Sequence, residues 1–417
     1  MKKALSIMLP ALVAVAAAPL LVPLGVAFCL MVRFRGKRPP ELTVPVDPGR
    51  VVRKPKTMQE ALEILEGSSR RRLIPAGAAA VVSALVEWLP LLLNNLRSVS
   101  GIIYPYPDIF EAVVLDSMDN TPVYGLVAFQ EGTSRRPALV LAHDFLSSKN
   151  NYGMLSLALR AFYKWGFNVL ALDFRNSGDS NRFSSAPSSW GFRESEDILA
   201  AAEYLYSTGR VSTVGVFGSG MGASSALLAA RKARPEFPLS GGVVALGGYA
   251  DSRRQIELLS GGPPGTSSER LARLFLRSML LLRTAVGGPR PFNSFLEYSR
   301  QISGQYYETG EEELLARSSP ESCIRAVETP CLLVHPAGSR VVPSRELQAL
   351  SCKAAVNPMV GVLDLPECIS SPCQLTGKKW FHEMLRLYFS YWSEYSPGSE
   401  LGVQGLQSID LLGNPDN

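Results

Sequence analysis

The chain has 417 residues, of which 46% are hydrophobic and 19% charged, and its net charge is +5. This composition excludes a disordered chain, and the modest charge argues against a nucleic-acid partner. Six cysteines without a Cys-x-x-Cys pair do not form a disulfide scaffold. The chain has only three histidines (His143, His335 and His382), which leaves little to build a zinc site. We therefore expect neither a metal nor a cofactor.

The first apolar stretch covers residues 4–32, carries no charge and follows Lys2 and Lys3. At about 1.5 Å per residue, a helix of this length crosses a hydrocarbon core of about 30 Å. The pattern predicts a transmembrane anchor. A cleaved signal peptide is the other interpretation, with the small residues 16–18 at the cleavage site. Pro19 follows that site directly, and the apolar sequence continues beyond it, so we favour the anchor.

Basic residues after this stretch decide the expected orientation. They outnumber the two lysines before it, so the positive-inside rule places the domain in the cytoplasm; they are Arg33, Arg35, Lys37 and Arg38. A second apolar stretch at 73–93 is interrupted by Glu87. It is either a buried or interfacial helix or a second span, which would send the domain to the opposite side of the membrane.

From Phe110 onward, short apolar runs alternate with segments of helical period. This alternation predicts an α/β domain with a mostly parallel, doubly wound sheet. The predicted strands are 112–115, 124–129, 138–142, 168–172, 214–217, 242–246, 331–335 and 361–365. The predicted helices are 154–165, 195–206, a helix running from the turn after 217 to 233, and 378–392.

Residues 211–230 combine a β-branched strand, a glycine-dense turn and an alanine-rich helix pattern. This is the arrangement of a nucleophile elbow. On these residues the chain resembles the α/β-hydrolase superfamily, in its esterase and acyl-hydrolase-like branch. The family turn reads Gly-x-Ser-x-Gly, whereas this chain has Gly218, Ser219, Gly220, Met221 and Gly222. The resemblance therefore puts Gly220 at the nucleophile position.

Two further loops support the resemblance. Residues 139–153 are similar to the family's oxyanion loop, with Asp144 replacing the glycine after His143. This carboxylate either points inward, where it disfavours an oxyanion, or caps the following turn. Residues 173–180 are similar to a loop in which Asp173 and Arg175 would be structural. The resemblance also implies a helical cap insertion at about 255–310.

The acid and base of the family triad are also replaced. Residues 331–343 resemble the family's acid segment, with the acid position on Ser339. The base belongs between the last strand and the closing helix, and residues 366–377 contain no histidine. Ser370 or Ser371 is the nearest equivalent. The resemblance thus implies a degenerate triad at Gly220, Ser339 and Ser370.

We expect the following organisation. An N-terminal transmembrane anchor covers 1–36, a basic linker with a short helix 37–72, an apolar helix 73–100, an α/β-hydrolase-like domain 101–395, and a flexible tail 396–417. The expected ligand pocket contains His143, Asp144, Phe145, Ser219, Gly220 and Met221.

The missing triad predicts a pseudoenzyme on the membrane, a non-catalytic protein that binds a lipid-like or acyl ligand or acts as a scaffold. The alternative is an active serine esterase or acyl hydrolase with a displaced constellation, formed by Ser219 with His143 and Asp144.

Overall fold

The computed structural model describes residues 104–261, 294–336, 339, 341–365, 375 and 379–394, all within one compact unit, Val46–Asn417. The predictions made for the anchor, the linker, the second apolar stretch and the tail lie outside these residues. Among the helices that are described, none combines the length and apolar character needed to cross a bilayer.

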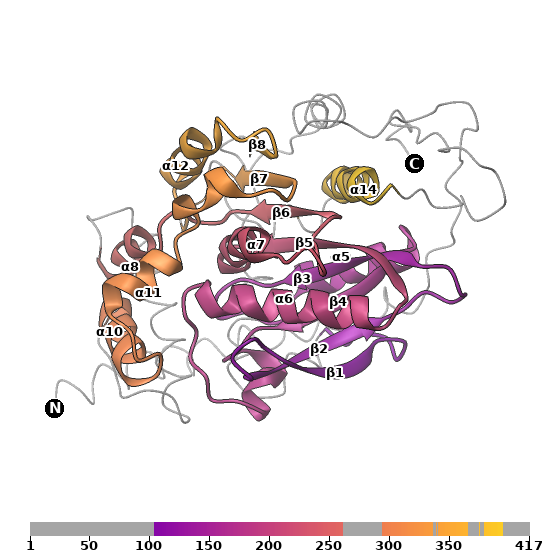
Figure 1. Ribbon diagram of the computed structural model, residues 1–417, viewed down its shortest axis with the longest axis horizontal. Coiled ribbons are helices and arrows are strands. Elements are labelled where there is room, and N and C mark those ends of the chain that lie inside the picture. The colour runs from indigo at the N-terminus through magenta and orange to yellow at the C-terminus, as the bar shows by residue number, and fades with distance from the viewer. Residues whose placement is uncertain are drawn as a thin grey trace, which may run out of the picture. The chain divides into compact units, whose positions relative to one another are not determined.

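A single sheet of eight strands forms the centre of the described part of the chain (Figure 1). The strand order is β1-β2-β4-β3-β5-β6-β7-β8. β2 pairs antiparallel with β1 and with β4, and all other neighbours are parallel. The strands are β1 (Glu111–Asp116), β2 (Pro122–Ala128), β3 (Arg136–Ala142), β4 (Asn168–Asp173), β5 (Val211–Ser219), β6 (Gly242–Leu246), β7 (Cys331–Pro336) and β8 (Val360–Leu365). The predicted mostly parallel, doubly wound sheet is confirmed.

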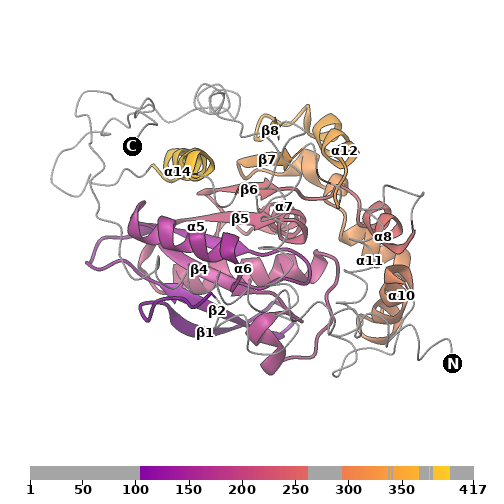
Figure 2. The same cartoon turned by 180° about the vertical axis from the view of Figure 1, so that it is seen from behind.

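Helices cover both faces of the sheet (Figures 1 and 2). One face packs against α5 (Tyr152–Tyr163) and α14 (Lys379–Ser393), and the other against α6 (Phe192–Ser207), α7 (Met221–Lys232) and α12 (Ser344–Ala354). The alternation along β3 explains this division, because Leu139 and Leu141 join one apolar cluster while Val140 and Ala142 join the other. Short 3-10 helices lie at Gly178–Arg182, Pro320–Ser322 and Ile324–Ala326.

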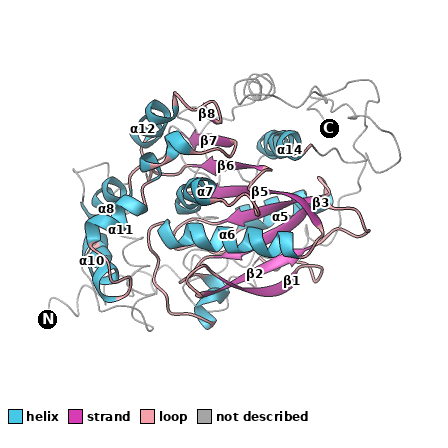
Figure 3. Ribbon diagram, in the orientation of Figure 1, coloured by secondary structure: helices cyan, strands magenta, loops and turns pink. Residues whose placement is uncertain are grey.

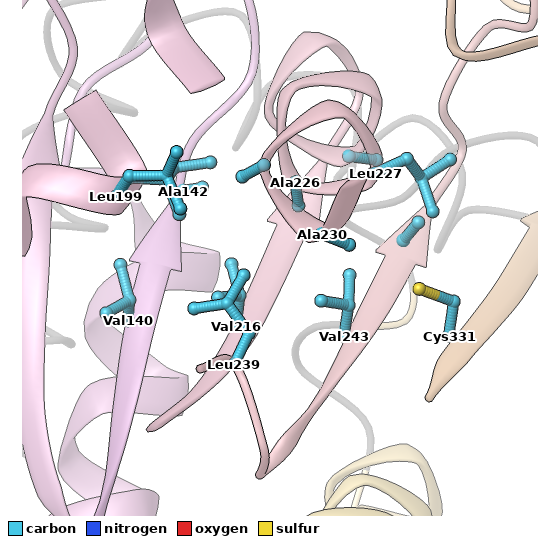
Figure 4. Close-up of a cluster of buried hydrophobic side chains, with 14 of the residues drawn as sticks. Val140, Ala142, Leu199, Val216, Ala226, Leu227, Ala230, Leu239, Val243 and Cys331 are labelled. Carbon is cyan, nitrogen blue, oxygen red and sulfur yellow. The ribbon is translucent and has the colours of Figure 1, made fainter. Parts of the chain in front are cut away.

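The core beneath α7 pairs small helix residues with β-branched strand residues (Figure 4). Ala226 and Ala230 of α7 lie in the same cluster as Val216 of β5 and Val243 of β6, and all four are buried. Full burial of a valine side chain stabilises a fold by about 1.5–3 kcal/mol. Because the α7 side chains that face the sheet are small alanines, the helix packs close to β5 and β6.

Among the described residues between β6 and β7, three α-helices lie together beside the sheet (Figure 3). They are α8 (Ser252–Gly261), α10 (Phe295–Gln305) and α11 (Glu311–Arg317). Their apolar side chains form a third cluster that also takes in Leu146 and Trp190 from loops at the edge of the sheet. They occupy the place in the chain that we predicted for the cap, while residues 262–293 lie outside the described part.

The start of α7 lies so close to the loop after β3 that backbone atoms of the two segments meet. A Cβ atom at Gly222 would lie 2.4 Å from the carbonyl oxygens of Ala142 and His143, and one at Gly218 would lie 2.3 Å from the Gly222 oxygen. These contacts leave no room for a side chain. The glycines are therefore required for the close approach of helix and loop.

Gly222→Ala should lower the free energy of unfolding by about 1–3 kcal/mol, because two main-chain carbonyls must move to accept the methyl group. Urea denaturation measures the change. The control is Gly304→Ala in α10, where no atom lies within 4 Å of the added carbon. That variant should be unchanged or more stable by up to about 1 kcal/mol. Equal losses in the two variants would contradict the close-approach argument.

Candidate active site

The turn between β5 and α7 has the backbone of a nucleophile elbow. Ser219 ends β5, Gly220 has φ 56° and ψ −121°, and Met221 begins α7. The Gly220 N–H donates a hydrogen bond to the Leu246 carbonyl oxygen at 2.9 Å. A positive φ of this kind suits glycine. The elbow therefore has its expected shape, and position 220 presents no side chain.

The Asp144 side chain points inward and fills the space that an elbow side chain would take. A Cβ atom built on Gly220 would lie 1.9 Å from Asp144 Oδ1, 2.0 Å from Cγ and 2.2 Å from Oδ2. Asp144 comes from the loop after β3, which is the neighbour of β5 in the sheet. The carboxylate points toward Gly220, and it also accepts the N–H of Phe145 in the turn that follows. Aspartate at 144 and glycine at 220 thus depend on each other.

Two backbone donors meet at one oxygen of this carboxylate. The N–H groups of Phe145 and Met221 both donate to Asp144 Oδ1, at 2.6 and 2.8 Å. Met221 is the first residue of α7, so its N–H has no acceptor within the helix and carries the positive end of the helix dipole. Two N–H groups from separate segments, aimed at one negatively charged oxygen, have the geometry of an oxyanion hole.

His143 lies beside Asp144, but its ring bonds to the main chain. The ring is buried and packs edge-on against Phe174, with centroids 4.9 Å apart. Nε2 accepts a hydrogen bond from the Phe174 N–H at 3.1 Å, and Nδ1 lies 2.8 Å from the Asp144 carbonyl oxygen. The ring therefore protonates on Nδ1 and donates there. Ser219, His143 and Asp144 are close in the fold, yet the imidazole bonds position the loop after β3.

Of the predicted acid and base positions, only the first lies within the described residues. Ser339 follows β7, and its hydroxyl accepts from the Val342 N–H at 3.3 Å, which forms a turn. Ser370 is outside the described residues. The remaining histidines are buried, His335 in β7 and His382 in α14. The degenerate triad remains a prediction.

Buried charges hold the loops around the site. Lys149 Nζ bonds Asp173 Oδ2 at 2.5 Å and Asp179 Oδ2 at 2.7 Å. Arg175 bonds Asp197 Oδ1 at 2.6 Å. Burial acts to lower the pKa of Lys149, but the two carboxylates outweigh it and raise that pKa. Asp173 and Arg175 thus have the structural role that the resemblance implied. No pattern in the sequence singles out Lys149, because its burial and its partners depend on contacts between distant segments.

An aromatic wall adjoins the two N–H donors. The ring of Phe145 lies 4.8 Å from that of Trp190 and 6.2 Å from that of Phe295, which belongs to α10. Trp190 has φ 60°, and its carbonyl oxygen accepts a hydrogen bond from the hydroxyl of Tyr249. Burial, and the charges of Glu194 and Asp144, raise the pKa of Tyr249 well above its usual value, so this phenol stays a donor. Phe145, which is half-buried, is the ring of this wall that reaches the surface beside the donors.

Within the described ranges, no three His, Cys, Asp or Glu residues are grouped so that they could hold a metal ion.

Comparison with known proteins gives distant structural likenesses only. No protein-family profile and no curated protein matches the chain. An esterase of Pyrococcus furiosus is 17% identical over 68% of this chain and 93% of its own, with a TM-score of 0.47. A puromycin hydrolase is 17% identical over 70% and 40%, with a TM-score of 0.47. An acylaminoacyl peptidase is 14% identical over 76% and 46%, with a TM-score of 0.46.

These proteins are named as an esterase, a hydrolase and a peptidase. Against them, our prediction of a non-catalytic ligand-binding or scaffolding protein is wrong, and the alternative of an active hydrolase agrees better. The fold itself is identified by its topology: the sheet order, the elbow and the helices on both faces are those of an α/β-hydrolase fold, as the resemblance implied.

Gly220→Ser should destabilise the protein by about 1–3 kcal/mol, because its Cβ would overlap the Asp144 carboxylate. In an Asp144→Gly background the same substitution should cost at least about 1 kcal/mol less. Urea denaturation of the four proteins gives this coupling energy.

The matched control repeats the cycle with Asp144→Asn, which keeps the volume of the side chain. The cost of Gly220→Ser should fall in the Asp144→Gly background and should not fall in the Asp144→Asn background. Additive effects in the glycine cycle would show that the two side chains do not compete for one volume.

Proposed function

We propose that the domain hydrolyses carboxylic esters or related acyl compounds. The observation that carries this proposal is the pair of N–H groups, from Phe145 and Met221, that converge on one carboxylate oxygen. A carboxylate oxygen has the charge that a carbonyl oxygen acquires when its carbon is attacked. A site that holds the first is therefore suited to stabilise the second.

The energetic value of such a pair is large. Loss of one oxyanion donor lowers kcat by about 10²–10³ in a studied protease. Here both donors belong to the backbone, and one begins α7, so they are fixed before substrate arrives. The partial burial of the site strengthens their interaction with an oxyanion, because the local dielectric constant is lower than that of water.

The aromatic wall favours an apolar acyl group. Phe145, Trp190 and Phe295 lie against one another beside the donors, and Trp190 and Phe295 are buried. We propose a lipid-like or other apolar acyl compound as substrate, because burial of such a group contributes about 0.8 kcal/mol per methylene.

We also propose that residues 4–32 anchor the chain in a membrane with the domain on the cytoplasmic side. The support is the uncharged length of this stretch and the basic residues that follow it. An anchor of this kind would bring the domain close to acyl compounds dissolved in the bilayer.

The purified protein should hydrolyse p-nitrophenyl esters, and kcat/KM should rise from acetate to octanoate. We expect a rate at least about 10³ above the buffer reaction, the level that an oxyanion hole and binding supply without a triad. Release of nitrophenolate measures it. A folded protein, with a cooperative thermal transition, that turns over none of these esters would refute the proposed function.

Full-length protein expressed in cells should sediment with membranes and resist carbonate extraction, since a span of this length inserts stably. A chain lacking residues 1–36 should move to the soluble fraction. If the shortened chain also resists extraction, residues 73–93 hold it in the membrane, and the single anchor is wrong.

A further inference from the structure

We propose that Asp144 is the general base of this hydrolysis and that water attacks the acyl carbon directly, with no acyl-enzyme. The inference rests on the proposed function and assigns its catalytic residue. It follows from where the carboxylate lies, from what binds it, and from the bonds of the neighbouring histidine.

The carboxylate fills the volume in which an elbow side chain would begin. Its three carboxyl atoms lie within 1.9–2.2 Å of the point where a Cβ atom at residue 220 would stand. In an elbow, a side chain at that point attacks the substrate carbonyl. Asp144 brings a proton acceptor into this volume from the adjacent loop, and Gly220 provides the space.

The bonds of the carboxylate allow exchange with substrate. Oδ1 is held by two backbone N–H groups that suit a carbonyl oxygen equally well. A substrate carbonyl can therefore replace Oδ1 between them. Asp144 is partly exposed, so its carboxylate has a direction in which to move. Since its Cα remains in the loop, the displaced carboxylate stays beside the acyl carbon.

The histidines do not supply the base. His143 uses Nε2 to accept from the Phe174 N–H and has Nδ1 against the Asp144 carbonyl oxygen. His335 lies in β7, two strands from β5, and His382 lies in α14. The chain has no other histidine. Of the groups described at the elbow, the Asp144 carboxylate is the proton acceptor nearest the point of attack.

The reaction then proceeds in two steps. The Asp144 carboxylate takes one proton from water while the water oxygen bonds to the acyl carbon, and the carbonyl oxygen becomes an oxyanion bound by Phe145 and Met221. The C=O bond re-forms, the bond from the acyl carbon to the alkoxy oxygen breaks, and that oxygen takes the proton from the Asp144 carboxyl. An acid and an alcohol leave, and the carboxylate returns to the N–H pair.

Two variants at residue 144 test this role through separate effects on kcat and KM. Asp144→Asn keeps an oxygen for both N–H groups but cannot take a proton, so kcat should fall by about 10²–10⁴ while KM changes less than about threefold. Asp144→Gly also lacks the base, but it removes the group that competes with substrate, so KM should fall along with kcat. Asp116→Asn is the charge-matched control. It lies exposed on β1 at the edge of the sheet, and its activity should be unchanged.

The second measurement is covalent labelling with a fluorophosphonate probe, followed by intact-mass analysis of the protein and of Ser219→Ala. No adduct is expected. If Asp144→Asn keeps the wild-type kcat, or if an adduct forms that is lost in Ser219→Ala, the general-base role is wrong while the hydrolase proposal stands. If the wild-type protein hydrolyses no ester, both fail, so the two failures are distinct.

Discussion

The absence of side chains at one turn is the constraint on which the site depends. The start of α7 lies against the loop after β3 with carbonyl oxygens where a Cβ of Gly222 would be. This contact brings the N–H groups of Met221 and Phe145 to the same oxygen atom, although the two residues lie 76 positions apart in the chain. The alanine-rich face of α7 extends the same close approach down the sheet, since Ala226 and Ala230 pack on Val216 and Val243.

Buried ion pairs make the surrounding loops rigid. Lys149 joins the loop after β3 to the end of β4 through Asp173, and Arg175 joins the next loop to α6 through Asp197. Removal of one partner from such a pair costs about 3–5 kcal/mol, because the other charge is left buried and uncompensated. The loops are thus fixed before any ligand binds. Preorganised donors do not need to reorient as charge develops, and this is the main source of their effect on a reaction rate.

The sequence predicts the fold well because its signals are local. The apolar periods of strands and helices predict the elements of the sheet and its covering helices. The glycines at 218, 220 and 222 predict the elbow. The sequence predicts the candidate site less well than the fold. The direction of the Asp144 side chain depends on a neighbouring strand that is distant in the chain, so no local pattern reveals it. The bonds of Lys149 to Asp173 and Asp179 likewise join segments that are distant in the chain. The proximity of Asp144 to Gly220 has the same character, because it joins two loops that are far apart in the chain. The helix α11 has only seven residues, which is too short to give a clear period.

The shared volume of residues 144 and 220 also restricts how this site changes by mutation. A serine at 220 and an aspartate at 144 exclude each other, since the Asp144 oxygens lie where the serine Cβ would stand. A route by single substitutions that avoids this overlap passes through a chain with a small residue at both positions. That intermediate has two N–H groups and no reactive side chain beside them. A change at either position is therefore expected to require a change at the other.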